Sequence, residues 1–523
     1  MRQEQGFIDY IQQSIIQNWD RNALTDYQGI TLQYKDVARK IAKFHIVLES
    51  AGVQPGDKIA VCGRNSAHWA VAFLATLTYG AVVVPILHEF KADNIHNIVN
   101  HSEAKFLFVG DQVWENLNEG AMPLLLGIVL LTDFNPIVCR NDQLLEAFEH
   151  RNAIYGARYP KNFRPENICY RKEESPEELA IINYTSGTTG YSKGVMLPYR
   201  SLWSNIAYCH EMLPVRPGDP IVSMLPLGHV FGMVYDFLFG FSVGAHLYFL
   251  TRMPSPKIIA QSFSEIKPRV ISCVPLIVEK IIKKNILPLI DNKIGKLLLR
   301  MPIVNDKIKA DIRKFPYTIA YGMTECGPII CSSRWENLKL ASCGKATTRM
   351  EVKIDSPDPQ HVAGEIICKG SNLMLGYYKN DEATSQIIDM NGWLHTGDLA
   401  TMDAEGNVTV RGRSKNMLLT SSGQNIYPEE IESKLNNMPY VSESLIVLQQ
   451  EKLVALIYPD FDDAFAHGLE QANIQKVMED NRKELNLQLP AFCQITKVKI
   501  HFEEFEKTAK KSIKRFMYQD VKG

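Results

Sequence analysis

The sequence predicts an α/β protein with a large N-terminal domain of parallel α/β sheets and a small α+β C-terminal domain. Apolar strands alternate with helical patterns up to about residue 110, and glycine-punctuated short strands follow from about residue 340. A new α+β pattern begins past Arg413. A chain of 523 residues is also too long for one ordinary core. We therefore expect two domains, 1–412 and 413–523.

The N-terminal elements are predicted from apolar spacing and from their glycine stops. Alternation of strand and helix favours a parallel sheet with helices on its faces. Residues 110–175 are less regular. The predicted order is helix 31–54, strand 58–62, helix 67–79, strand 81–86, helix 93–101 and strand 105–109.

The later elements are shorter strands. Strands are predicted over 221–225, 270–274 and 317–320. A small antiparallel or β-barrel-like region then has strands at 351–354, 365–369, 399–402 and 408–411. The C-terminal domain is predicted to contain helix 428–435, strands 444–447 and 453–457, and helix 474–485.

Composition narrows the class of protein. With 46% hydrophobic and 22% charged residues, the chain is typical of soluble globular proteins. A net charge of −1 gives no reason to expect nucleic acid as a partner. Ten cysteines without a C-x-x-C pair indicate reduced thiols in the cytoplasm. The longest apolar runs, 122–131 and 237–250, are too short to span a bilayer, which leaves peripheral membrane contact open.

Residues 184–195 carry the strongest chemical signal. Serine and threonine residues alternate with glycines around the single lysine, Lys193. Glycines let backbone N–H groups approach a ligand, successive N–H groups form an anion site, and the lysine adds a positive charge. The segment therefore predicts a cradle for polyphosphate. Its candidate binding residues are Thr185, Ser186, Gly187, Thr188, Thr189, Gly190 and Lys193.

A flexible linker is the alternative for this segment, but it explains neither the lysine nor the apolar residues on both sides. The segment is not a Walker A loop, because Ser192 stands five residues beyond Gly187 and Gly194 follows the lysine. It resembles the signature loop of the acyl-adenylate-forming superfamily, which includes acyl-CoA synthetases. The family usually has proline where this chain has Ser192.

The segment Tyr321–Glu325 follows a predicted strand, where α/β enzymes present ligand-binding residues. A solvated cap is the alternative for a lone carboxylate. The segment resembles the second ATP motif of the superfamily. The resemblance implies that Tyr321 and Gly322 adjoin adenine, Thr324 contacts phosphate and Glu325 holds Mg²⁺. One glutamate is enough, since Mg²⁺ takes most ligands from phosphate and water.

Residues 391–398 end in Gly397-Asp398, which we interpret as a tight glycine turn, and an aspartate on such a turn can accept both hydroxyls of a ribose. A hairpin turn is the alternative. The segment resembles the Gly-Trp-Leu-x-Thr-Gly-Asp motif of acyl-CoA synthetases. The resemblance implies that Asp398 binds ribose with help from Arg413, that Lys415 is a hinge of a mobile C-terminal domain, and that the loop around Gly423 approaches the thiol acceptor.

His229 is a weaker candidate. A histidine between apolar residues is often a satisfied core residue. The segment 226–232, Pro-Leu-Gly-His-Val-Phe-Gly, nevertheless matches a family motif that lines the acyl pocket. Both interpretations stay open. The apolar residues after it, to Phe241, are taken as ordinary core.

Two departures from the family pattern bear on activity. The register set by Lys507-Thr508 and Lys514-Arg515 places Ser512 where the family has its C-terminal catalytic lysine. Lys511 or Lys510 could reach instead, and a basic surface tail explains the segment equally well. The interval between Pro275 and Tyr321 is also shorter than in the family, and no glycine loop is seen there. Loss of the family strand in this interval would damage both the parallel sheet and the nucleotide site, and would impair activity.

The resemblance implies a fatty acid–CoA ligase of the long-chain type, which converts fatty acid, ATP and coenzyme A to acyl-CoA, AMP and pyrophosphate. A carboxylate is a poor electrophile, and transfer to AMP makes an activated anhydride. Mg²⁺ and the loop donors would neutralise charge on phosphate. Two alternatives remain: a degenerate nucleotide- or acyl-binding protein without turnover, and ligation to an acyl carrier protein.

Overall fold

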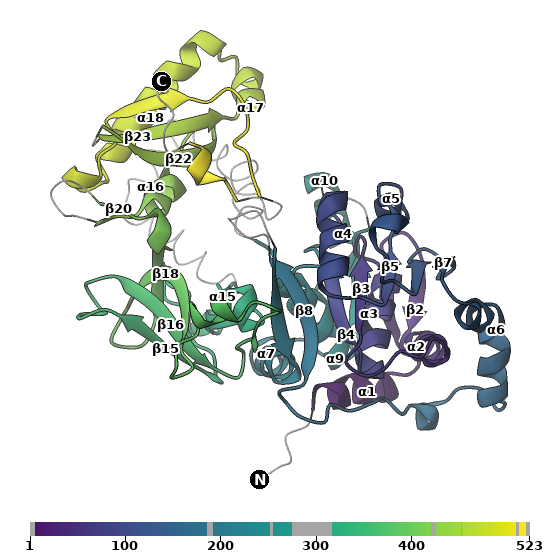
Figure 1. The fold of residues 1–523 in the computed structure, drawn as a ribbon. Helices are drawn as coiled ribbons and strands as arrows, with labels where there is room; N and C mark the ends of the chain where they lie inside the picture. The colour runs from purple at the N-terminus through teal and green to yellow at the C-terminus, as the bar shows by residue number, and fades with distance from the viewer. Residues whose placement is uncertain are drawn as a thin grey trace.

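The computed structural model describes residues 6–185, 192–251, 255–274, 316–419, 425–450, 452–508 and 512–518. In Figure 1 the N-terminal elements, coloured purple to teal, lie on one side. The antiparallel strands after residue 316 and the C-terminal elements, coloured green to yellow, lie on the other. Within the described part of the chain, no helix has both the length and the apolar character that crossing a membrane requires.

An eight-stranded sheet organises the N-terminal part. Its central strands, from β8 to β6, pair in parallel, and the strands at both edges are antiparallel. In spatial order the strands are β17 (Gly376–Tyr377), β9 (Lys193–Pro198), β8 (Leu179–Thr185), β4 (Val82–Ile86), β3 (Lys58–Cys62), β5 (Phe106–Val109), β6 (Gly127–Leu130) and β7 (Pro136–Cys139).

Both faces of this sheet are buried. Along β3, Ile59 and Val61 pack in one core, whereas Ala60 and Cys62 pack in the other, because successive side chains of a strand point to opposite faces. One core includes residues of α2 (Tyr34–Ser50), α3 (Ala67–Tyr79) and α6 (Asp142–Arg158), and the other includes residues of α4 (Ala92–His101).

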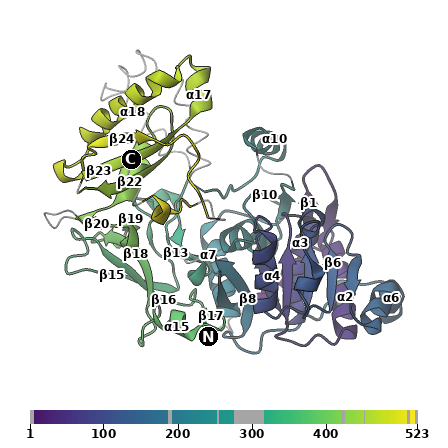
Figure 2. The same ribbon diagram turned by 45° about the horizontal axis from the view of Figure 1, so that its top comes forward.

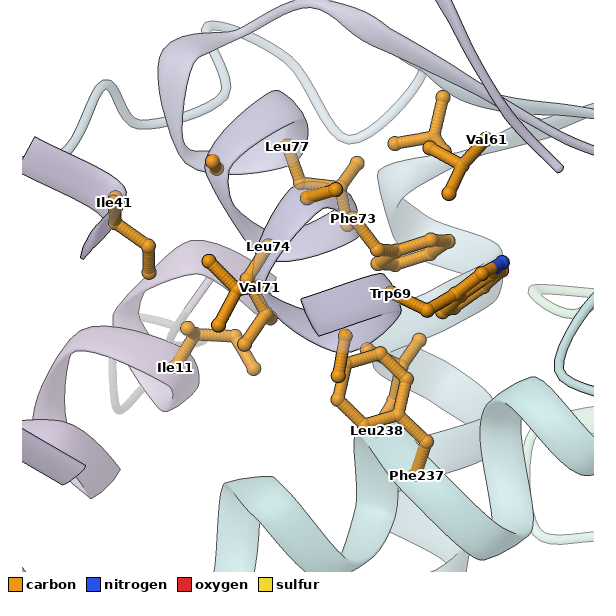
Figure 3. Packing of buried hydrophobic residues seen from close by; sticks show 14 of the residues in the cluster. Ile11, Ile41, Val61, Trp69, Val71, Phe73, Leu74, Leu77, Phe237 and Leu238 are labelled. Atoms are coloured by element: carbon orange, nitrogen blue, oxygen red, sulfur yellow. The ribbon is translucent and has the colours of Figure 1, made fainter. Parts of the chain in front are cut away.

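Helix α3 is buried on nearly all sides within the larger core, as its mostly apolar sequence requires. Figure 3 shows its side chains against those of neighbouring elements. The rings of Trp69 and Phe73 stack at 5.3 Å, and both meet the edge of Phe237. The predicted bounds of α3 and β3 are confirmed.

A second, four-stranded sheet packs on the far side of this core. Its spatial order is β10 (Pro220–Ser223), β11 (His246–Phe249), β1 (Asn22–Asp26) and β2 (Thr31–Gln33). The helical segments of this region are α1 (Phe7–Gln17), α7 (Tyr199–Met212), the short α8 (Val230–Gly232), the π-helix η3 (Met233–Phe239), α9 (Gly240–Val243) and α10 (Pro256–Ile266).

Three predictions for this part need correction. The predicted helix 31–54 begins with the short strand β2 and becomes helical at Tyr34. The strand predicted over 270–274 is wrong: Val270 makes one bridge to Ile221 and the ladder ends, since Ser272 interrupts the apolar run. The strand predicted over 317–320 is also wrong, and strand pairing begins only at Tyr321.

The region 110–175 contains α6, which the sequence pattern did not reveal. Of its 17 residues, only Leu144, Ala147 and Phe148 are buried. So narrow an apolar stripe gives little helical periodicity, and the remaining surface is polar. Two strands of the large sheet, β6 and β7, also lie in this region.

Small antiparallel sheets follow residue 316. A three-stranded sheet contains β12 (Tyr321–Gly322), β13 (Ile329–Ser332) and β14 (Lys345–Ala346). A four-stranded sheet contains β15 (Met350–Asp355), β16 (Gly364–Gly370), β18 (Leu394–Met402) and β19 (Val408–Arg413), and α15 (Asp381–Ser385) lies between its second and third strands in sequence. This confirms the predicted antiparallel region.

The C-terminal part has its own sheet and core. Figure 2 shows α18 covering one face of the sheet. The strands are β22 (Val441–Gln449), β23 (Lys452–Pro459) and β24 (Lys497–Ile500), with the small pair β20 (Leu418–Leu419) and β21 (Asn425–Ile426). The helices are α16 (Pro428–Leu435), α17 (Phe461–Ala466) and α18 (Gln471–Asn486).

A buried ion pair ties the end of the described chain to α16. The carboxylate of Glu432 is only 7% exposed and accepts a bond of 2.8 Å from Arg515 Nη1. Arg515 Nη2 bonds the second carboxylate oxygen, and the Ile446 N–H donates to the first at 2.7 Å. Both oxygens therefore have partners, which a buried charge requires.

Candidate functional site

The predicted phosphate loop lies between two paired strands. Strands β8 and β9 are antiparallel, and Thr185 pairs with Lys193, so the two ends of the loop lie side by side. Tyr184 is buried under this pair and bonds the ring of His101 at 2.7 Å. The predicted binding residues between the ends lie outside the described residues: Ser186, Gly187, Thr188, Thr189 and Gly190.

Lys193 and Glu325 are brought to the same place by a residue that the sequence did not single out. The ammonium nitrogen of Lys193 lies 4.8 Å from the centre of the Tyr377 ring. The hydroxyl of Tyr377 donates a hydrogen bond of 2.9 Å to Glu325 Oε1. The loop lysine and the predicted metal ligand, 132 residues apart in sequence, thus belong to one site.

The turn that carries Glu325 is buried and tightly packed. Thr324 and Glu325, in the 3-10 turn η4 (Thr324–Cys326), are 5% and 8% exposed. The Met374 N–H donates to the Glu325 carbonyl at 2.9 Å. A Cβ on Gly322 would lie 1.9 Å from the Pro328 carbonyl oxygen, so only glycine fits in this part of the motif.

A second chain of contacts joins Tyr321, Asp398 and Arg413. The Tyr321 hydroxyl donates to Asp398 Oδ2 at 2.7 Å, and Arg413 Nε lies 2.9 Å from Asp398 Oδ1. Burial raises the pKa of Asp398, and the Arg413 charge and the Tyr321 hydroxyl oppose that rise. Burial and the neighbouring carboxylate also raise the pKa of Tyr321, which keeps the phenol protonated.

The sequence predicted that Asp398 lies on a tight turn, and this prediction is wrong. Asp398 lies within the nine-residue strand β18 and is the register partner of Arg413 on β19. The glycine has a different role: Gly397 lies in the strand with a φ of +72°, and the pairing register with β19 shifts between Leu399 and Ala400. The Asp398 carboxylate accepts from Tyr321 beside this irregularity.

The two chains adjoin. The negative charge of Glu325 is one of the influences that raise the pKa of Asp398. Glu429, at the start of α16, is another, so the C-terminal part also reaches this site. The predicted residues Thr185, Lys193, Tyr321, Glu325, Asp398 and Arg413 therefore surround one location where the large sheet, the small sheets and α16 meet.

His229 lies at the start of a short helical turn beside strand β8. Its Nδ1 accepts a bond of 3.2 Å from the Phe231 N–H. The Asn183 side chain, two residues before Thr185, donates to the Gly228 carbonyl at 3.0 Å. A Cβ on Gly228 would lie 3.0 Å from the Ile86 carbonyl, which explains the glycine. The motif is thus anchored to the strand that leads into the phosphate loop.

A buried carboxylate fixes the segment before this turn. Asp236, on η3, is 0% exposed, and its Oδ2 accepts bonds from the Met224 and Leu225 N–H groups at 3.2 and 3.1 Å. Burial raises its pKa to about 7, although these bonds oppose the rise. The side chain holds the end of β10 against the π-helix.

The structure describes the residues on both sides of Lys511, but not Lys511 itself. Gly423, Lys511 and most of the shortened interval 275–321 lie outside the described residues. The flanks of Lys511 form a hairpin: Lys507 bridges Ile513, and the Thr508 N–H donates to the Ser512 carbonyl at 2.9 Å. Ser512 is exposed on this hairpin.

The sequence did not single out three residues of the site: Tyr377, Asn183 and Glu429. Tyr377 follows a glycine in a two-residue strand and has no charged neighbour in sequence that would mark it. Asn183 is the one polar residue in the apolar run 179–184, which is a signal that could have been used, since a buried amide needs a partner.

Comparison with known proteins agrees with this arrangement. The sequence profile of the AMP-binding enzyme family matches residues 11–378, and that of the AMP-binding enzyme C-terminal domain matches residues 415–520. The first match alone covers more than half of the chain. The protein therefore belongs to the AMP-binding enzyme family, as the sequence resemblance predicted.

Individual relatives differ in their substrates. The chain is 28% identical over 430 residues to the 3-[(3aS,4S,7aS)-7a-methyl-1,5-dioxo-octahydro-1H-inden-4-yl]propanoyl:CoA ligase of Rhodococcus jostii (strain RHA1), with 80% of this chain and 81% of the relative covered. It is 26% identical over 473 residues to the long-chain-fatty-acid–CoA ligase of Escherichia coli O6:H1, with 84% and 82% covered.

A solved structure confirms the fold class. The crystal structure of the anthranilate CoA ligase AuaEII in complex with anthranoyl-AMP matches with a TM-score of 0.77 and 21% identity. The match covers 98% of this chain and 96% of the other. The predicted large sheet domain with a smaller C-terminal domain is therefore confirmed.

Proposed function

We propose that the protein activates a carboxylic acid with ATP and transfers the acyl group to the thiol of coenzyme A. In the first step a carboxylate oxygen attacks the α-phosphorus of ATP, and pyrophosphate leaves. In the second step the thiol sulfur attacks the acyl carbon and AMP leaves. The observation that carries the proposal is the chain of contacts from the Lys193 ammonium through the Tyr377 ring and hydroxyl to the buried Glu325 carboxylate.

Each residue has a proposed role in these steps. Thr185 and Lys193 bind the phosphates, Thr324 supports them, and Lys193 neutralises charge on the leaving pyrophosphate. Tyr321 and Gly322 flank adenine, while Asp398 accepts the ribose hydroxyls with Arg413 beside it. We assign the acyl end to His229, and the thiol side to Gly423 and Lys511. The other loop residues, Ser186, Gly187, Thr188, Thr189 and Gly190, bind phosphate through their N–H and hydroxyl groups.

The residues present fit a magnesium ion. Glu325 offers a carboxylate at the phosphate end of the site, and Tyr377 occupies Oε1 as a hydrogen-bond donor. One carboxylate with phosphate oxygens and water matches what Mg²⁺ prefers. When bound, the ion would supply positive charge that offsets charge on the polyphosphate.

The proposed acid is a long-chain fatty acid, and the proposed location is the cytoplasm. The fatty acid assignment is supported by similarity to the long-chain-fatty-acid–CoA ligase of Escherichia coli. The Rhodococcus relative is named for a bicyclic propanoyl substrate, so chain length needs direct measurement.

The test is pyrophosphate release on mixing the protein with ATP, MgCl₂ and acids of several classes. We expect release with long-chain fatty acids, thioester formation with coenzyme A, and none with acyl carrier protein. Lys193→Ala should abolish release, whereas Lys339→Ala, a surface lysine paired with Asp403, should not. Turnover unchanged by Lys193→Ala would remove this lysine from the mechanism.

A second candidate is a nucleotide- and acyl-binding protein without turnover. It is favoured by Ser512, which lies on the hairpin where the family pattern has a lysine. ATP binding without pyrophosphate release from any acid would support this candidate over the ligase.

A further inference from the structure

Tyr377 contacts both ends of the phosphate site. Strand β17 pairs with β9, and Tyr377 is the register partner of Val195, two residues from Lys193. Its side chain is buried at 5% exposure. The ring lies 4.8 Å from the Lys193 ammonium, and the hydroxyl donates to Glu325 Oε1 at 2.9 Å.

The segment around Tyr377 holds Glu325 at two points. The Met374 N–H donates to the Glu325 backbone carbonyl, and the Tyr377 hydroxyl donates to its carboxylate. One bond fixes the backbone of the turn, and the other selects the orientation of the side chain. A carboxylate fixed in this way loses little conformational entropy when it binds a cation.

The chemistry of the phenol suits this task. A phenol ordinarily titrates at about pH 10, so its hydroxyl is a donor over the physiological range, and here the Tyr377 hydroxyl donates to Glu325 Oε1. A neutral donor leaves the negative charge of the carboxylate in place, whereas a lysine at this position would cancel it. The ring face meanwhile attracts the Lys193 ammonium without consuming its hydrogen-bond donors.

We propose that Tyr377 is a positioning residue that orients the Glu325 carboxylate for Mg²⁺–ATP and keeps Lys193 beside it. The inference rests on the proposed function only in taking Glu325 as the magnesium ligand. Hydrogen-bond partners of ligating carboxylates typically change metal affinity by about 10- to 100-fold. The effect should therefore appear in the magnesium dependence of nucleotide binding.

The chain offers a matched control in the next residue. Tyr378 follows Tyr377 in sequence but lies in the turn after β17, and its side chain has different partners. Its hydroxyl lies 3.3 Å from Glu103 and its ring meets that of His101 edge-on. Tyr378→Phe therefore removes the same atom as Tyr377→Phe, and within the described part of the chain the Tyr378 side chain contacts neither Lys193 nor Glu325.

The experiment is calorimetric titration of ATP into wild type, Tyr377→Phe and Tyr378→Phe, each with MgCl₂ and with EDTA. Magnesium should strengthen ATP binding by a factor that is about tenfold smaller in Tyr377→Phe than in wild type. The ATP affinity of Tyr377→Phe in EDTA should change little, and Tyr378→Phe should match wild type in both conditions. An unchanged magnesium gain in Tyr377→Phe would overturn the proposal. A loss that is equal with and without magnesium would overturn it too, because it would indicate a purely structural role.

A double variant keeps the test independent of folding defects. In a Glu325→Gln background, Tyr377→Phe should have no further effect on the magnesium gain, since the group on which it acts is gone. An equal effect in both backgrounds would contradict the proposal. The assay needs no turnover: a protein that releases no pyrophosphate but keeps this magnesium pattern would refute the ligase function and retain the role of Tyr377.

Discussion

The two chains of contacts at the site differ in how they are held. The Lys193–Tyr377–Glu325 chain lies between strands of the large sheet and a buried turn, with Tyr377 and Glu325 at 5% and 8% exposure. The Tyr321–Asp398 chain runs along the small sheets and ends on Arg413, whose side chain is 59% exposed. Packing fixes the first chain, whereas the second ends near α16 and the predicted hinge.

This difference fits two tasks in the proposed mechanism. Charges that stabilise a developing anion need to be fixed before the reaction, and we propose that the first chain supplies them. If the C-terminal part turns at the predicted hinge, the exposed Arg413 lets the second chain form and break its contact. We therefore expect substitutions in the first chain to affect the chemical step and the magnesium-dependent part of ATP binding, and substitutions in the second to affect binding of the nucleotide itself and the acyl transfer.

The largest effect should come from Glu325→Gln. The amide keeps the shape of the side chain but removes the charge that we assign to magnesium, so the rate of pyrophosphate release should fall by about 10²- to 10³-fold. Steady-state assays at saturating ATP measure this. The exposed Glu336→Gln is the control. A fall confined to the KM for ATP would assign Glu325 to binding and remove the contrast between the chains.

Asp398→Asn should weaken nucleotide binding. The substitution removes the carboxylate charge that pairs with Arg413 and receives the hydrogen bond of Tyr321. Loss of a hydrogen bond from ribose to a charged group corresponds to a decrease of roughly 10- to 100-fold in nucleotide affinity. Calorimetry with AMP measures the change, and Asp355→Asn, on an exposed position of β15, should leave it unaltered. Equal AMP affinity in Asp398→Asn and wild type would exclude Asp398 from the ribose site.

Ser512→Lys should increase activity. The hairpin from Lys507 to Ile513 places this position where the family pattern has lysine, and the side chain is exposed, so the substitution should not disturb folding. A charge-assisted hydrogen bond from the new lysine should raise the rate of pyrophosphate release by about tenfold. A rate that does not rise would indicate that Lys511 or Lys510 already serves.

Asp236→Asn should alter stability and leave the site largely unchanged. The folded pKa of Asp236 is raised to about 7 from an ordinary value of 3.8. The stabilisation from its protonated form is therefore complete below about pH 4 and is lost as pH rises through about 7, with a size on the order of a few kcal/mol. Thermal melts from pH 5 to 8 should show a steeper loss in wild type than in the amide variant; parallel curves would contradict this.

Sequence patterns predicted the N-terminal fold well because both faces of the large sheet are buried. Strand β3 and helix α3 are almost wholly apolar, and their ends are marked by polar and glycine residues. Helix α6 escaped prediction because few of its residues are buried. The strand predicted over 270–274 was wrong because strand pairing depends on a partner that the local sequence does not specify, and only Val270 forms a bridge.

The site was predictable where a residue type is chemically rare in its context. Lys193 among glycines and Glu325 after a strand are such cases. Tyr377 was not predictable, because its function depends on two partners that are 184 and 52 residues away in sequence. Asp398 was singled out as a ribose-binding candidate by the resemblance, yet its place in a strand was missed because Gly397 indicates a turn and a strand irregularity equally well.

The ion pair between Glu432 and Arg515 has a consequence for biosynthesis. Helix α16 can form as soon as its residues have left the ribosome, but its buried carboxylate lacks a counter-ion until 83 further residues have been synthesised. An unpaired charge at 7% exposure opposes closure of the surrounding core. The C-terminal unit thus completes its folding late, and premature termination before Arg515 leaves a species that quality-control proteases can recognise.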